Sequence, residues 1–150
     1  MSADTALRVL VVEDEALLAM DIEAVVEDAG HQLVGEAACT RSAEALPDDT
    51  DPHLAFVDLQ LAHGTNGLDV SGMIRRRWPE TVVVFVTANP RLIPVDYGGP
   101  FGVIAKPFSH TGLTAALRYL NEGIIRPPPS SPLPAVLRAS PGLMQRLKAA

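Results

Sequence analysis

Apolar segments of two kinds alternate along most of this chain, and that alternation constrains the fold more than any other feature. Runs rich in β-branched residues, typical of buried strands, are separated by segments in which apolar residues recur at helical spacing. The predicted strands are residues 7–12, 33–38, 54–57, 81–86 and 102–105, and the predicted helices lie near residues 18–29, 41–46, 68–78 and 113–120. This repetition predicts an α/β fold, with a doubly wound sheet of five parallel strands and helices on both faces.

Composition narrows the class of protein. The chain has 150 residues, of which 47% are hydrophobic, enough for one domain with a core. Its net charge of −6 argues against nucleic acid as a partner. Because no apolar run reaches the roughly 18 residues of a membrane helix and no signal segment is evident, we expect a soluble cytoplasmic domain with no membrane partner. The single cysteine and the scattered histidines lack the spacing of a metal site: Cys39, His31, His53, His63 and His110.

The composition changes near residue 126. All 18 acidic residues precede this point, whereas residues 127–150 contain three basic residues and open with three prolines. We therefore divide the chain into a domain over residues 1–126 and a proline-rich linker with a short apolar-basic tail over residues 127–150. Ser140 followed by Pro141 is typical of a helix start. The tail is predicted either to fray or to form a short segment that packs on the domain or on a partner.

Charged and hydroxyl side chains stand at the ends of the predicted strands. Ligands of open α/β sheets bind at the carboxyl ends of the strands. The residues at these ends are Glu13, Asp14, Asp58, Thr87, Ala88, Lys106 and Pro107. Three clustered carboxylates repel one another unless a cation is present, and Mg²⁺ prefers oxygen ligands. An ammonium and a hydroxyl suit phosphoryl oxygens, and a carboxylate can accept the group, so the pattern predicts phosphoryl transfer to Asp58.

With these residues in this order, residues 6–123 resemble the receiver domain of two-component response regulators. The resemblance implies a flavodoxin-like (βα)5 fold with strand order 2-1-3-4-5. It also implies that Asp58 accepts a phosphoryl group from a sensor histidine kinase or a histidine phosphotransfer protein. The Mg²⁺ ligands it implies are Glu13, Asp14, Asp58 and the backbone carbonyl of Gln60. It further implies phosphoryl contacts from Thr87 and Lys106, and a cis peptide bond before Pro107.

The sequence departs from the family pattern after the fourth strand. Val103 stands where the family has an aromatic residue that moves with the threonine, and Tyr97 and Phe101 are candidates to replace it. Three prolines interrupt residues 89–100, and interior prolines break helices, so the fourth helix is expected to be short or irregular. These features resemble those of stand-alone, single-domain receivers in which the region after the fourth strand is atypical.

The expected role is that of a phosphoacceptor signalling protein, not an enzyme in the ordinary sense, with Mg²⁺-dependent self-phosphorylation and autodephosphorylation. Only 24 residues follow residue 126, too few for a DNA-binding domain, so we expect output through contact with an unknown downstream protein. The protein is expected to be a monomer or a weak homodimer. A haloacid dehalogenase-type phosphatase would need a second aspartate where Gln60 stands. A phosphorylation-independent protein-binding module on a receiver scaffold is the alternative that Val103 and the broken fourth helix favour.

Overall fold

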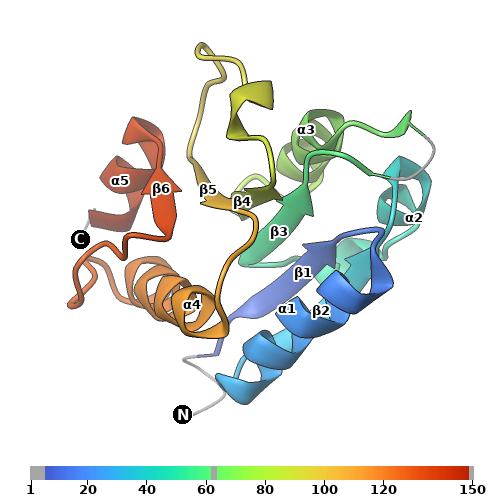
Figure 1. The fold of residues 1–150 in the computed structure, drawn as a ribbon. Coiled ribbons are helices and arrows are strands. Elements are labelled where there is room, and N and C mark those ends of the chain that lie inside the picture. Colours follow the sequence, from blue (N-terminus) through green and yellow to red (C-terminus); the bar gives the residue numbers. More distant parts are fainter. Residues whose placement is uncertain (1–5, 62–63, 149–150) are drawn as a thin grey trace.

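Parallel strands form the centre of the computed structural model, which describes residues 6–61 and 64–148 (Figure 1). The strands lie in the order β2-β1-β3-β4-β5-β6. Their bounds are β1 (Arg8–Val12), β2 (Gln32–Ala37), β3 (Leu54–Asp58), β4 (Val82–Thr87), β5 (Phe101–Ala105) and β6 (Leu137–Ala139). The first five are parallel, which confirms the predicted fold class and the order 2-1-3-4-5. The antiparallel strand β6, which lengthens the sheet beyond β5, was not predicted from the sequence.

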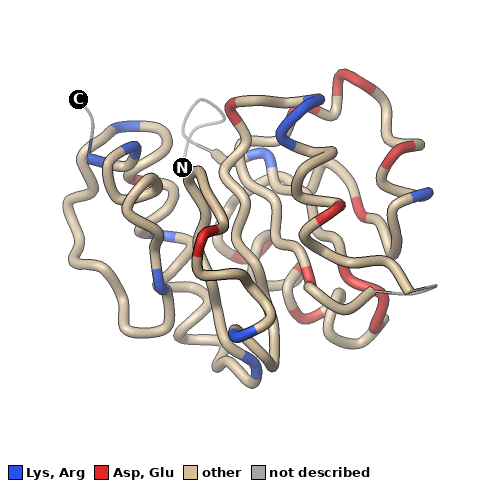
Figure 2. The backbone as a smooth tube through the Cα atoms, turned by 90° about the horizontal axis from the view of Figure 1, so that it is seen from above, with Lys and Arg blue, Asp and Glu red and all other residues tan. Residues whose placement is uncertain are grey.

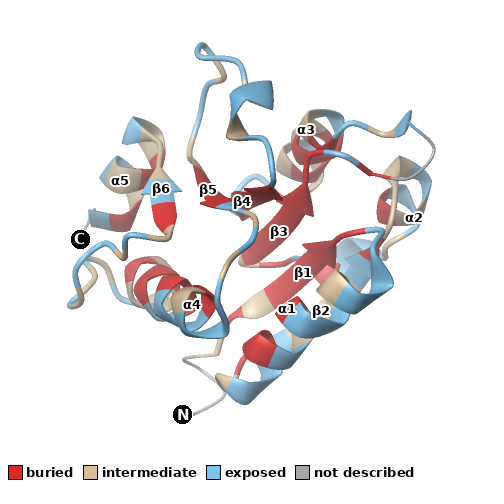
Figure 3. Cartoon of the chain, in the orientation of Figure 1, coloured by how far each residue is buried: buried red, intermediate tan, exposed pale blue. Residues whose placement is uncertain are grey.

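Helices cover both faces of the sheet. One face is covered by α1 (Ala16–Asp28), α4 (His110–Ile125) and α5 (Pro141–Lys148), and the other by α2 (Thr40–Glu44) and α3 (Gly67–Arg77). Because side chains alternate along a strand, β1 contributes Val9 and Val11 to one core and Leu10 and Val12 to the other. The central strands are therefore buried on both faces (Figure 3). No helix in the described ranges is long and apolar enough to cross a membrane.

The connection from β4 to β5 contains no α-helix. Its only helical turn is the 3-10 segment η4 (Pro90–Leu92), as the prediction of a short or irregular fourth helix requires. The remaining residues are held against α3: the Tyr97 ring packs on Phe85 at a centroid distance of 5.7 Å, and its hydroxyl donates to Ser71 Oγ at 3.0 Å. The Arg75 guanidinium donates to two carbonyl oxygens of this connection. Side-chain contacts thus hold this connection against α3 and β4 without a helix.

The C-terminal segment packs on the domain. Leu137, Leu143 and Leu147 are at most 2% exposed and join the core beneath α1 and α4. The predicted helix start is confirmed, because Ser140 Oγ accepts the N–H of Leu143 at 3.1 Å. The same oxygen accepts the N–H of Phe101 in β5. The change of composition at residue 126 therefore does not coincide with a boundary in packing.

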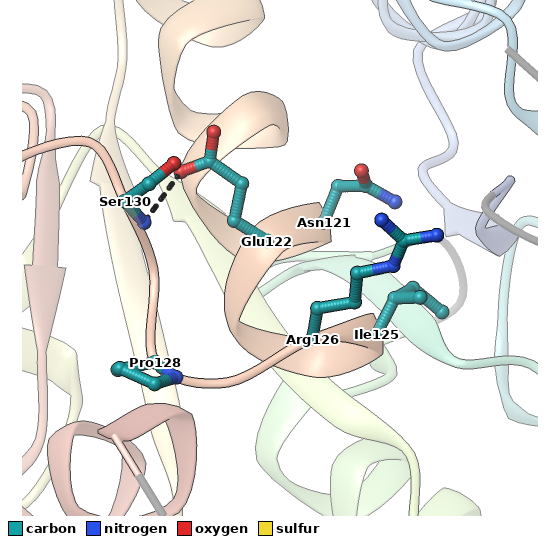
Figure 4. A pocket seen from close by; sticks show the side chains of 6 residues that line it. All are labelled: Asn121, Glu122, Ile125, Arg126, Pro128 and Ser130. Carbon is teal, nitrogen blue, oxygen red and sulfur yellow. Dashed lines mark hydrogen bonds between the residues drawn. The ribbon is translucent and has the colours of Figure 1, made fainter. Parts of the chain in front are cut away.

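Glu122 of α4 anchors the proline-rich linker. One carboxylate oxygen accepts N–H groups from Ser130 and Ser131 and the hydroxyl of Ser131, the last at 2.6 Å. Figure 4 shows this carboxylate turned toward Ser130 at the edge of a surface pocket, with the linker passing Pro128 below it. The charged carboxylate thus fixes the turn that leads the chain from α4 toward β6.

Candidate functional site

Three carboxylates meet at the carboxyl ends of β1 and β3. Glu13 and Asp14 follow β1, and Asp58 is the last residue of β3. One oxygen from each carboxylate lies within 4.8 Å of the others. Glu13 and Asp58 are 7% and 6% exposed, whereas Asp14 is exposed. The predicted carboxylates are therefore neighbours in space, two of them in the interior and one at the solvent boundary.

Lys106 bridges the two buried carboxylates. Its Nζ donates to Glu13 Oε1 and to Asp58 Oδ2, each at 3.1 Å. Lys106 follows β5, and its backbone N–H donates to the carbonyl oxygen of Thr87 at 2.8 Å, which fixes the start of the loop against β4. The peptide bond from Lys106 to Pro107 is cis. One ammonium thus partly offsets a local excess of negative charge.

Burial sets the protonation behaviour of this cluster. Burial, followed by repulsion from Asp58, raises the pKa of Glu13 to about 7, against the lowering effect of the Glu15 N–H and Lys106. Burial acts to lower the pKa of Lys106, but its hydrogen bonds to Glu13 and Asp58 outweigh that effect and raise it. Lys106 is therefore held as a cation, and the site lacks enough positive charge for all three carboxylates.

Backbone N–H groups orient the side chains of Asp58 and Thr87. Asp58 Oδ1 accepts the N–H of Gln60 at 3.1 Å, and Oδ2 faces Lys106. Thr87, at the end of β4, is 1% exposed, and its Oγ1 accepts the N–H of Asn89 at 3.0 Å. That contact leaves the hydroxyl hydrogen of Thr87 available as a donor. Ala88, which separates Thr87 from Asn89, is exposed.

The structure places the other predicted residues as follows. Gln60 forms an isolated bridge with Asn66 in the loop after β3. Val103 lies in the middle of β5, between Phe85 of β4 and Arg138 of β6 in the sheet register, and is 8% exposed. His63 lies outside the described residues.

Gly67 supports the site in a way that the sequence analysis missed. A Cβ atom at this position would lie 2.1 Å from the carbonyl oxygen of Asp58. Only a glycine therefore allows α3 to begin directly against the end of β3, where Asn66 caps the helix by accepting the N–H of Leu68. The signal was the Asn66-Gly67 pair just before the predicted helix.

The three carboxylates suit a hard divalent cation. Mg²⁺ is bound through one or two carboxylates together with water and phosphate oxygens, and here two buried carboxylates share one ammonium. Among the described residues, the donor atoms that meet here are carboxylate oxygens, which Mg²⁺ prefers, whereas zinc favours cysteine and histidine. The cluster therefore fits a magnesium ion.

Comparison with known proteins places this geometry in a family. The model of the response regulator receiver domain matches residues 9–118, and the chain belongs to that family. The chain is 37% identical over 119 residues to the phyllosphere-induced regulator PhyR of Methylorubrum extorquens, a match covering 78% of this chain and 44% of that protein. It is 25% identical over 118 residues to the chemotaxis protein CheY of Thermotoga maritima, covering 77% of this chain and 98% of CheY.

Solved structures agree with this assignment. The receiver domain of the Erythrobacter litoralis PhyR response regulator superposes with a TM-score of 0.70 at 27% identity, covering 87% of this chain and 98% of that one. The response regulator PhyR from Brucella abortus gives a TM-score of 0.65 at 37% identity, covering 73% of this chain and 45% of that one. The chain spans about half the length of the first curated relatives it matches.

Proposed function

We propose that this receiver domain accepts a phosphoryl group on Asp58, with the help of Mg²⁺, and signals through protein contacts. The observation that supports the proposal most is the position of Lys106, whose Nζ lies 3.1 Å from Oδ2 of Asp58 and 3.1 Å from Oε1 of Glu13. An ammonium at this place would lie beside a phosphoryl group on Asp58. It would neutralise charge where phosphoryl transfer requires it.

The reaction would take the phosphoryl group from a phosphohistidine. A carboxylate oxygen of Asp58 would attack phosphorus, a P–O bond would form, and the P–N bond would break as the donor imidazole leaves and takes up a proton. The Gln60 N–H would keep the acceptor carboxylate in position through its bond to Oδ1. Lys106 and the Thr87 hydroxyl would contact phosphoryl oxygens once the group is attached.

Glu13, Asp14, Asp58 and the backbone carbonyl of Gln60 would hold the magnesium ion. When bound, Mg²⁺ would offset the negative charge on the acceptor and on the incoming phosphoryl oxygens. Glu13 and Asp14 lie on the segment that leads from β1 into α1, and one oxygen from each lies within 4.8 Å of an oxygen of Asp58. Those residues would therefore keep the cation beside the acceptor.

The proposed donors are a sensor histidine kinase and a histidine phosphotransfer protein. The proposed output is contact with an unidentified downstream protein, through a shift in the populations of receiver conformations. The cytoplasm is the proposed compartment, since two-component phosphotransfer takes place there.

Mass spectrometry of the intact protein tests the proposal. Incubation with acetyl phosphate and Mg²⁺ is expected to add one phosphoryl group, and the adduct should be absent from Asp58→Ala and from samples treated with a chelator. If the small donor fails, phosphorylated histidine kinases take its place in the same assay. Absence of the adduct with every donor, in a folded protein, would overturn the proposal.

A phosphorylation-independent binding module is the second candidate. The connection between β4 and β5 lacks a helix, and Val103 occupies the position of the family's moving aromatic residue, which favours a receiver scaffold without the usual switch. A partner-binding measurement separates the two functions, because this candidate requires equal binding by the unmodified protein, by Asp58→Ala and by the phosphorylated protein.

A further inference from the structure

A groove lies where the sheet has no covering helix. Side chains of β5 alternate, so Phe101 and Val103 point to the α3 face, and Arg138 of β6, opposite Val103, points the same way. The β4–β5 connection forms the other wall with Pro90, Ile93 and Val95, and the groove has a volume of about 240 Å³. In Figure 1 this connection and β6 stand on either side of β5.

The groove is apolar at its base and exposed at its rim. Val103 lies at the base and is 8% exposed, whereas Val95 at the rim is fully exposed. In this fold a helix normally covers such a sheet face, because a sheet must bury its apolar side against another layer. The 3-10 turn of residues 90–92 is too short to do so.

The basic residues around the groove favour a partner with acidic side chains. Sixteen of the 18 acidic residues lie in residues 1–87, whereas seven of the 12 basic residues lie in residues 88–150. Figure 2 shows most Asp and Glu on the side of the molecule away from the C-terminus. At the groove itself Arg138 lines one wall and Arg91 is exposed beside Pro90. The one opposing charge on this connection is Asp96, which follows Val95.

We propose that this groove binds an amphipathic helix of a partner protein, with apolar side chains against Val103 and Val95 and acidic side chains toward Arg138 and Arg91. The helix would take the place of the missing crossover helix and complete the second layer on this face. A basic or uncharged helix of the same shape would lack the electrostatic attraction. The proposal does not depend on phosphorylation of Asp58, so either can fail while the other stands.

The probe is a synthetic peptide of about four helical turns, with leucines along one face and glutamates beside them. It is titrated into the full-length, unphosphorylated, isotope-labelled protein and followed by amide chemical shifts. Shifts are expected in the amides of residues 91–93, 95 and 101–103 and of β6. A matched peptide with lysines in place of the glutamates is expected to bind about tenfold more weakly.

Surface variants locate the binding site. Val95→Glu and Arg138→Glu change exposed side chains and are each expected to weaken binding by about tenfold. Leu133→Glu and Arg41→Glu make the same kinds of change outside the groove and are expected to leave binding unchanged. Equal binding of both peptides, shifts confined to other surfaces, or no binding would overturn the proposal. Concentration-dependent dimerisation lost in Val95→Glu would assign the groove to a second copy of this chain.

Discussion

The ammonium of Lys106 lies 3.1 Å from Oδ2 of Asp58, although 47 residues separate the two in the chain. This ion pair joins the ends of β3 and β5, two strands that do not pair with each other but flank β4. Because Glu13 shares the same ammonium, removal of the lysine leaves two buried carboxylates without a counter-ion.

Replacement of Lys106 by methionine should strengthen Mg²⁺ binding and weaken phosphorylation. The lysine competes with a divalent cation for the same carboxylates, so its loss is expected to lower the dissociation constant for Mg²⁺ several-fold, measured by calorimetry. Phosphorylation by acetyl phosphate is expected to slow about tenfold or more, because the neutralising charge beside the phosphoryl group is gone. Lys148→Met, at the only other lysine, is the control. Weaker Mg²⁺ binding in Lys106→Met would contradict the account.

Replacement of Gly67 by alanine should move α3 away from the site. The added Cβ would meet the carbonyl oxygen of Asp58 at 2.1 Å, and that oxygen belongs to the backbone of β3 and cannot rotate away. We expect the free energy of unfolding to fall by about 2 kcal/mol or more, measured by urea denaturation. Gly72→Ala in the same helix meets only the Arg76 side chain at 3.5 Å, and is expected to be neutral or stabilising. Equal stability of the two variants would refute this reading of the contact.

Truncation of Leu143 tests whether the C-terminal segment belongs to the core. Leu143 is fully buried between α5 and the sheet, and Leu143→Ala is expected to cost about 2–5 kcal/mol of unfolding free energy. Leu133, in the linker, is 41% exposed, so Leu133→Ala is expected to change stability by less than about 0.5 kcal/mol. Chemical denaturation of both variants measures the difference. A negligible effect of Leu143→Ala would mean that the tail is not packed in solution.

Acid should release the anchor of the proline-rich linker. The Ser131 hydroxyl, with the backbone N–H of Ser131 and Arg118, lowers the pKa of Glu122 from 4.5 to about 2. Since the folded-state pKa is the lower one, the carboxylate stabilises the fold fully above pH 4.5 and loses that contribution as the pH falls toward 2. We expect Glu122→Gln to cost about 1 kcal/mol at neutral pH and to flatten the stability profile between pH 4.5 and 2. An unchanged profile would show that these hydrogen bonds do not form in solution.

Much of the fold could be predicted because the central parallel strands are buried on both faces. Such strands appear as short apolar runs, and their ends mark the site, as Asp58 and Thr87 show by closing β3 and β4. The three prolines within residues 89–100 likewise predicted that a regular fourth helix would be absent. The local sequence pattern was sufficient for these strands and for this connection, because the local conformational preference of the residues agrees with the structure that they adopt in the fold.

The remaining features depend on contacts between distant segments. Strand β6 has three residues, of which only Leu137 is buried, so no alternation marks it, and its pairing with β5 creates it. The packing of Tyr97 on Phe85 and its hydrogen bond to Ser71 also depend on the position of α3. The sequence suggested Tyr97 as a substitute for the missing aromatic residue, and that role stays a prediction.

Chemical trapping of the phosphorylated residue tests the central claim most directly. Borohydride reduces an aspartyl phosphate to homoserine, so treatment of the protein after incubation with phosphodonor and Mg²⁺, followed by peptide sequencing in a mass spectrometer, identifies the acceptor. The account predicts homoserine at position 58, with Asp14, Glu13 and the remaining acids unmodified. Reduction at another carboxylate, or a phosphoryl adduct that persists in Asp58→Asn, would contradict it.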